Sequence, residues 1–168
     1  MTDQRILIAG IGNIFLGDDA FGCEVAQRLA RRTLPDGVCV VDFGIRGFDL
    51  AYALLDDYDA TIMIDALPRG EPPGTLFVIE PELNEAALGA QMIDTHAMHP
   101  VKVLQLVRAL GGEPKRLLVV GCVPATLGPE EGQMGLSEPV QAAVDEAVRL
   151  VESLVEKIRA EDRVAGQV

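Results

Sequence analysis

The sequence predicts an α/β fold in which a mixed, mostly parallel sheet carries helices on both faces. Several apolar runs are unbroken rather than alternating, which is typical of strands buried on both sides. Up to residue 65 these runs alternate with helical segments in the order β-α-β-α-β, and this order favours parallel strands joined by crossover helices. The third and fourth strands are joined by residues 66–74, which contain three prolines and are too few for a crossover helix. One strand should therefore run against the others.

The first half of the chain supplies three strands and two helices. The apolar run at residues 5–10 predicts the first strand. Residues 20–32 are predicted as a helix, because Val25, Ala26 and Leu29 recur at helical spacing and arginines gather where the helix dipole favours positive charge. The remaining elements are a strand at 38–42, a short helix at 48–55 and a strand at 60–65.

The second half adds two strands and two helices. The fourth strand, at 75–79, should run antiparallel to the third. Residues 81–98 have no clear period and are predicted to be a functional or mobile loop with one helical turn near 85–88. The later elements are a helix from Pro100 to the Gly111-Gly112 pair, a strand at 117–123, and a long amphipathic helix that Ser137 caps.

Length and composition predict one cytosolic domain. The 168 residues suit a single domain over residues 1–160, with a frayed polar tail at 161–168. The net charge of -12 disfavours nucleic acids and anionic membranes as partners, and no apolar run is long enough to span a bilayer. The three cysteines form no C-x-x-C pair, so we expect buried thiols in a reducing cytoplasm.

Common nucleotide-binding motifs do not fit this chain. Gly10-Ile11-Gly12 follows a strand, but the third glycine of a dinucleotide loop would fall at Phe15, and Asp18-Asp19 would repel a pyrophosphate. No Gly-Lys-Ser/Thr sequence occurs, which excludes a P-loop.

Two carboxylates fall where the carboxyl ends of the central strands should meet. Asp19 lies on the loop after the first strand, and Asp65 ends the third. In a doubly wound sheet the second and third strands flank the first, so a crevice opens between these two strand ends. Two carboxylates in a partly dry crevice repel each other unless a cation or a shared proton neutralises them.

Both histidines of the chain, His96 and His99, lie in the segment that leads into the helix at Pro100. One imidazole beside two carboxylates would form an open site for a divalent transition metal. Ordinary structural roles compete with this interpretation. Asp18 or Asp19 could cap the first helix, Asp65 could cap a turn, and either histidine could be a plain loop residue.

Nucleophilic catalysis finds less support. Cys23 and Cys122 are predicted core residues rather than nucleophiles, and the two serines, Ser137 and Ser153, fall in helix contexts. Asp42, at the end of the second strand, is predicted to be structural.

The segment from Gly10 to Gly22, GIGNIFLGDDAFG, resembles the opening motif of the nickel-iron hydrogenase maturation endopeptidases. The similarity continues over nearly the whole chain, through the segments at 42–47, 64–66 and 74–76, the His96 segment and residues 120–124. The chain departs from many members in having Ile45-Arg46 after Gly44 and in reading His-Ala-Met-His-Pro at 96–100.

The resemblance implies a three-layer α/β/α sandwich with a five-stranded mixed sheet. It also implies an aspartyl-type endopeptidase that removes a C-terminal extension from the precursor of a hydrogenase large subunit after nickel insertion. The family's two acids match Asp19 and Asp65, and its histidine matches His96. These three residues would hold nickel that the substrate supplies, with no permanently bound cofactor. The expected supporting residues are Asn13, Asp18, Asp42 and His99.

Two other functions remain open at this point. One is a non-enzymatic nickel carrier or checkpoint that binds the immature subunit without cutting it. The other is a different peptidase or small hydrolase on the same fold.

Overall fold

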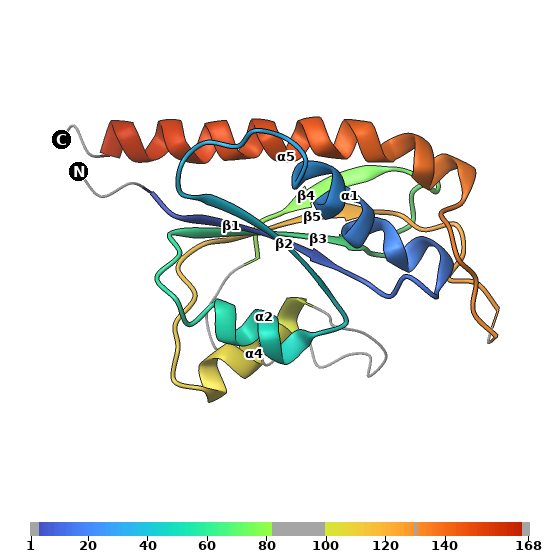
Figure 1. The fold of residues 1–168 in the computed structure, drawn as a ribbon, viewed down its shortest axis with the longest axis horizontal. Helices are drawn as coiled ribbons and strands as arrows, with labels where there is room; N and C mark the ends of the chain where they lie inside the picture. Colours follow the sequence, from blue (N-terminus) through green and yellow to red (C-terminus); the bar gives the residue numbers. More distant parts are fainter. Residues whose placement is uncertain (1–3, 82–99, 130, 166–168) are drawn as a thin grey trace.

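The computed structural model describes residues 4–81, 100–129 and 131–165. Its strands form one five-stranded sheet in the spatial order β2-β1-β3-β5-β4, and four of them are parallel (Figure 1). The mixed, mostly parallel sheet predicted from the sequence is confirmed. The strands are β1 (Ile6–Ile11), β2 (Val38–Gly44), β3 (Ala60–Ala66), β4 (Leu76–Ile79) and β5 (Leu117–Cys122).

The antiparallel strand is β4, as its short proline-rich connection from β3 predicted. β4 pairs with β5, so that Leu76 lies opposite Cys122. β5 itself pairs with β3 and therefore lies between the two strands that the short connection joins. The connection thus reverses the chain direction while passing over one position in the sheet.

Helices cover both faces of the sheet and make three layers. Figure 1 shows α1 (Phe21–Leu29) and α5 (Glu138–Ala165) on one side, with α2 (Gly47–Ala53) and α4 (Pro100–Ala109) on the other. Side chains of β1 alternate between the two resulting cores: Ile6 and Ile8 pack toward α1 and α5, whereas Leu7 and Ala9 pack toward α2 and α4. Both faces of β1 are buried, which explains its unbroken apolar sequence.

Some sequence predictions need correction or lie outside the described residues. Cys23 and Cys122 are buried as predicted, but Cys39 is exposed, because it lies on the edge strand β2. Helix α5 continues to Ala165, five residues beyond the boundary placed at 160. The helical turn predicted near 85–88 and nearly all of the loop predicted at 81–98 lie outside the described residues. No helix of the described ranges has both the length and the apolar character needed to cross a bilayer.

The start of α1 packs directly on the carboxyl ends of the central strands. A Cβ atom at Gly22 would overlap the carbonyl oxygens of Ile64 in β3 and Ile11 in β1. The absence of a side chain therefore lets the helix backbone touch the sheet. This contact brings the 3-10 turn just before α1, η1 (Gly17–Ala20), to the same edge of the sheet.

We predict that Gly22→Ala lowers the free energy of unfolding by about 3 kcal/mol, since the added methyl group meets main-chain atoms that cannot move aside. Gly70→Ala is the matched control. A Cβ at Gly70 has nothing within 4 Å, so this variant should stay within about 0.5 kcal/mol of the original protein. Urea unfolding of the three proteins measures the difference, and equal midpoints for both variants would contradict the close helix-to-sheet contact.

Candidate active site

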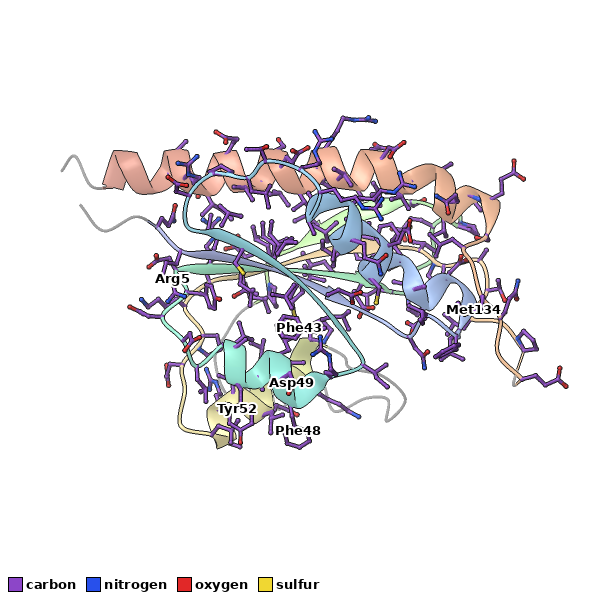
Figure 2. All side chains as sticks on the ribbon, in the orientation of Figure 1. Arg5, Phe43, Phe48, Asp49, Tyr52 and Met134 are labelled. Atoms are coloured by element: carbon purple, nitrogen blue, oxygen red, sulfur yellow. The ribbon has the colours of Figure 1, made fainter. Side chains whose placement is uncertain are left out.

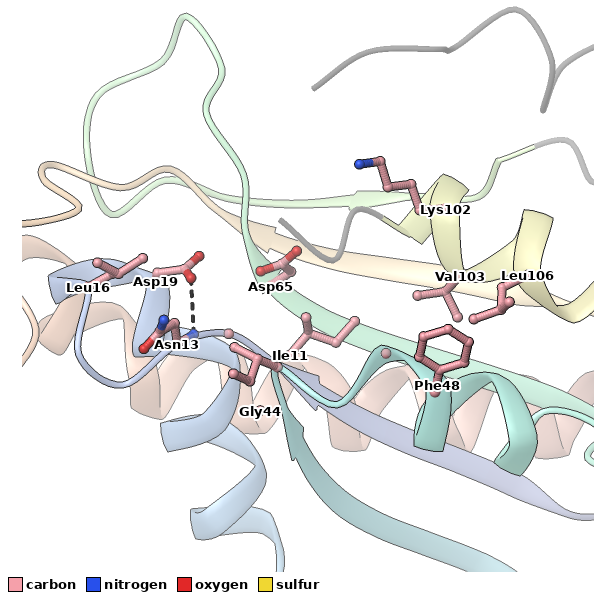
Figure 3. A pocket seen from close by; sticks show the side chains of 13 residues that line it. Ile11, Asn13, Leu16, Asp19, Gly44, Phe48, Asp65, Lys102, Val103 and Leu106 are labelled. Carbon is pink, nitrogen blue, oxygen red and sulfur yellow. Dashed lines mark hydrogen bonds between the residues drawn. The ribbon is translucent and has the colours of Figure 1, made fainter. Parts of the chain in front are cut away.

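A cavity of about 410 Å³ opens at the carboxyl ends of β1, β2 and β3. The chain leaves β1 toward β2 on one side and later returns as β3 on the other, so this edge is the topological switch point at which α/β proteins bind ligands. Asp19 and Asp65 both line the cavity, and Figure 3 shows their carboxylates beside each other. The structure therefore brings together the two carboxylates that strand order predicted to meet.

Asp19 is held by the loop that leaves β1. Its Oδ2 accepts a hydrogen bond from the backbone N–H of Asn13 at 3.0 Å, drawn as the dashed line in Figure 3. The Asn13 side chain accepts in turn from the N–H of Phe15 at 2.9 Å and so closes the loop locally. Glycine at position 12 permits this loop conformation, because any Cβ there would overlap the carbonyl oxygen of Asp19. Burial raises the pKa of Asp19, and the hydrogen bond from Asn13 partly opposes that rise.

Asp65 lies deeper, near the end of β3, and only 4% of its surface is exposed. Burial is the main reason why the pKa of Asp65 lies well above 3.8, and the negative charge of Asp19 raises this pKa further. A hydrogen bond from the backbone of Ala66 partly opposes the rise. Two carboxylates in this position are costly when both are ionised. A cation between them would remove that cost, so the pair fits a metal ion on chemical grounds.

Asp18 does not line the cavity and has a different role from its neighbour Asp19. It is fully buried, and its carboxylate accepts from the backbone N–H groups of Ala125, Thr126 and Ser137 at 2.8, 3.1 and 2.7 Å. It also accepts from the Ser137 hydroxyl at 2.8 Å. Burial alone would raise the pKa of Asp18, but these hydrogen bonds outweigh it and lower the pKa below its ordinary value. Neither Asp18 nor Asp19 caps α1, which has no side-chain cap.

Asp42 supports the wall of the cavity and does not line it. Its two carboxylate oxygens accept from the backbone N–H of Gly44 at 3.0 Å and from the side chain of Gln27 at 3.2 Å. Arg46 tightens the same turn by donating to the carbonyl oxygens of Asp42 and Phe43. The structural role predicted for Asp42 agrees with these contacts. The turn that it shapes places Gly44, Ile45 and Phe48 on the cavity wall.

The remaining predicted ligands lie outside the described residues. His96 and His99 both fall in the segment 82–99. Within the described part of the chain, no group of three or more His, Cys, Asp or Glu side chains is placed to hold a metal ion. The described site thus contributes two oxygen donors, Asp19 and Asp65.

Neither buried cysteine is suited to nucleophilic attack. Burial raises the pKa of Cys23 to about 12, and the nearby carboxylate of Asp42 adds to this effect. Burial likewise raises the pKa of Cys122 to about 12. Both thiols are protonated at neutral pH, whereas a catalytic cysteine needs a lowered pKa. The Ser137 hydroxyl is engaged with Asp18, which removes it from the cavity.

The residues of the opposite wall of the cavity were not predicted from the sequence. Lys102, Val103 and Leu106 of α4 line the cavity together with Phe48 of α2 (Figure 3). The available signal was their position in the chain: Phe48 lies four residues after the end of β2, and Lys102 lies in the first turn after the histidine segment. Among the lining residues that the structure describes, Lys102 is basic, and Asp19 and Asp65 are the acidic side chains beside it.

Comparison with known proteins agrees with this architecture. The chain is 35% identical to the hydrogenase 2 maturation protease of Escherichia coli over 150 residues, which cover 88% of each protein. Its structure matches the hydrogenase maturating endopeptidase HybD from E. coli with a TM-score of 0.77 and 32% identity, covering 92% of this chain and 93% of the other.

A second structural match is the nickel-iron hydrogenase maturation protease HybD from Thermococcus kodakarensis. Its TM-score is 0.68 at 26% identity, and the alignment covers 90% of this chain and 99% of the other. The family description hydrogenase maturation protease matches residues 23–154, which is most of the chain. The protein therefore belongs to the hydrogenase maturation proteases, a family of peptide-bond hydrolases.

Proposed function

We propose that the protein removes a C-terminal extension from the nickel-loaded precursor of a nickel-iron hydrogenase large subunit. Family membership supports a hydrogenase precursor as the substrate, since the relatives are named as maturation proteases of such enzymes. The observation that carries the nickel part of the proposal is the pair of carboxylates in one cavity, Asp19 half-buried and Asp65 almost fully buried.

In this proposal the nickel ion arrives as part of the substrate. Asp19 and Asp65 supply oxygen ligands, and His96 supplies the imidazole that a mixed nitrogen and oxygen site requires. The ion must displace the proton that burial favours on Asp65, so its binding releases a proton. A precursor without nickel lacks the charge that makes the carboxylate pair stable, and this would distinguish finished from unfinished substrate.

The same arrangement would serve the hydrolytic step. A peptide carbonyl beside the bound ion is polarised, or a water on the ion is deprotonated near neutral pH, and either effect assists attack on the scissile bond. Asp19 is the more accessible of the two carboxylates and is oriented by Asn13, so it would be the ligand nearer to the arriving peptide. Asp65 would hold the ion from the deeper side of the cavity.

Incubation of the purified protein with nickel-loaded precursor tests the function directly. Intact mass spectrometry of the large subunit should show the loss of a C-terminal peptide, and the peptide should appear as a separate species. Cys23→Ala should process at the original rate, because the Cys23 thiol has no role in the proposed chemistry. A stable complex with the precursor and no released peptide would replace the protease by a nickel-dependent checkpoint. Equal cleavage of peptides that hold no nickel would favour a different peptidase on this fold.

A further inference from the structure

Four large apolar side chains are exposed together beside the carboxylate cavity, and we call this surface the lip. Ile14 and Phe15 belong to the loop after β1 and are 42% and 59% exposed. Leu127 and Met134 belong to the loop between β5 and α5 and are 48% and 66% exposed. Exposed apolar clusters on a folded protein commonly mark a surface that binds another protein.

The two loops of the lip are fastened to each other. The N–H of Gln133 donates to the carbonyl oxygen of Phe15 at 2.7 Å, and the N–H of Gly17 donates to the carbonyl oxygen of Gln133 at 2.8 Å. The N–H of Asp18 donates to Thr126 at 2.9 Å. The buried Asp18 carboxylate then binds the start of the second loop and its end at Ser137. The lip is thus held in place before any partner arrives, which lowers the entropic cost of binding.

The lip is continuous with the cavity that holds the carboxylates. Leu16 lines the cavity and also forms a bridge with Gln133, whose neighbour Met134 belongs to the lip. Asn13, next to Ile14, binds Asp19 through its backbone. A protein seated on the lip would therefore lie within a few residues of Asp19.

The two segments that carry the lip hold charged side chains of one sign. Residues 6–27 and 117–148, which carry the lip, contain no lysine or arginine, while acidic side chains include Glu131 within the second loop. A partner that fits this surface has an apolar centre with lysine or arginine at its edge. Another copy of this chain is a poor match, because it has the same acidic edge and the same net charge of -12.

We propose that the lip is the docking surface for the large-subunit precursor, and that it receives an apolar patch with a basic edge next to the nickel and the cleavage point. This inference rests on the proposed function. Docking there would place the substrate's metal over Asp19 and Asp65 and would give the enzyme a means of recognising the folded subunit as well as its nickel.

The double variant F15S/M134S tests the docking surface. We expect its KM for the nickel-loaded precursor to rise at least about tenfold with kcat unchanged, because the lip contributes to binding and not to the chemical step. The melting temperature should stay the same, since both side chains are exposed. Leu110→Ser is the matched control: Leu110 is 38% exposed just after the end of α4, away from the cavity, and this variant should keep the original KM.

Charge reversal tests the chemistry of the partner. Glu131→Lys should raise KM and weaken its dependence on salt, as expected when one attractive charge at the edge becomes repulsive. An unchanged KM in the double variant would overturn the inference, and so would a fall in kcat alone.

Direct binding separates this inference from the proposed function. If the original protein binds the precursor but does not cleave it, the protease proposal fails, and weaker binding by F15S/M134S still supports the lip. If the original protein cleaves and the double variant cleaves equally well, only the lip proposal fails. Sedimentation velocity provides one more outcome: a dimer of the original protein that F15S/M134S dissociates would assign the lip to self-association and overturn docking of the precursor.

Discussion

Asp65→Asn is expected to reduce processing of the precursor at least about 100-fold and to make the free protein more stable at neutral pH. Asparagine keeps the size of the side chain but cannot take the negative charge that a cation needs. Burial and then the charge of Asp19 raise the pKa of Asp65 in the folded protein well above 3.8, so the folded chain keeps a proton that the unfolded chain has lost. The free energy of unfolding therefore falls as the pH rises from 3.8 to the folded pKa, and the variant escapes this loss.

Two measurements check this combination. Urea unfolding at a series of pH values should show that the advantage of Asp65→Asn grows with pH, while the processing assay shows the loss of activity. Asp49→Asn is a suitable control, because Asp49 forms an exposed ion pair with Arg46. This substitution should change the free energy of unfolding by less than about 1 kcal/mol. Original activity in Asp65→Asn, or a stability difference that is independent of pH, would contradict the assigned role.

Asp18→Asn is expected to do the opposite and lower the free energy of unfolding by at least about 3 kcal/mol. Three backbone N–H groups and one hydroxyl donate hydrogen bonds to the Asp18 carboxylate. The NH2 group of an asparagine side chain is itself a donor, so it could not accept the hydrogen bonds that one of the carboxylate oxygens accepts. The pKa of Asp18 is lowered in the folded protein, so its contribution is present above the ordinary value of 3.8 and is lost as the pH falls through the folded pKa.

The pH dependence distinguishes Asp18 from Asp65. The cost of Asp18→Asn should be constant from neutral pH down to mildly acidic pH, in contrast to the effect at Asp65, and urea unfolding measures both. Asp18→Asn should also process precursor more slowly when folded, because Asp18 fixes the turn that carries Asp19. A loss below about 1 kcal/mol would show that the loop between β5 and α5 is held by other contacts.

The layers of the fold could be predicted because the apolar pattern of each segment and its place in the order of strands and helices pointed to the same arrangement. The unbroken run at Ile6–Ile11 and the stripe of small apolar residues on α5 leave few alternatives for burial. The antiparallel direction of β4 followed from the length and prolines of one connection. The position of β5 between β3 and β4 could not be predicted in this way, because β5 lies far along the chain and its pairing depends on contacts between distant segments.

The site was predicted only in part, for a similar reason. Asp19 and Asp65 could be paired because strand order alone brings two strand ends together. The separate role of Asp18 could not be foreseen, since its partners lie more than one hundred residues away in a loop without regular structure. The placement of Phe48 and Lys102 on the wall likewise depends on how α2 and α4 pack on the sheet.

We propose that the two carboxylates, Asp19 and Asp65, recognise nickel carried by the substrate. The most direct measurement compares nickel-loaded precursor with the same precursor prepared without nickel, at equal concentrations, by following the mass of the large subunit over time. We expect rapid loss of the C-terminal peptide from the nickel-loaded form and no detectable loss from the nickel-free form. Equal rates of cleavage for both forms would contradict it.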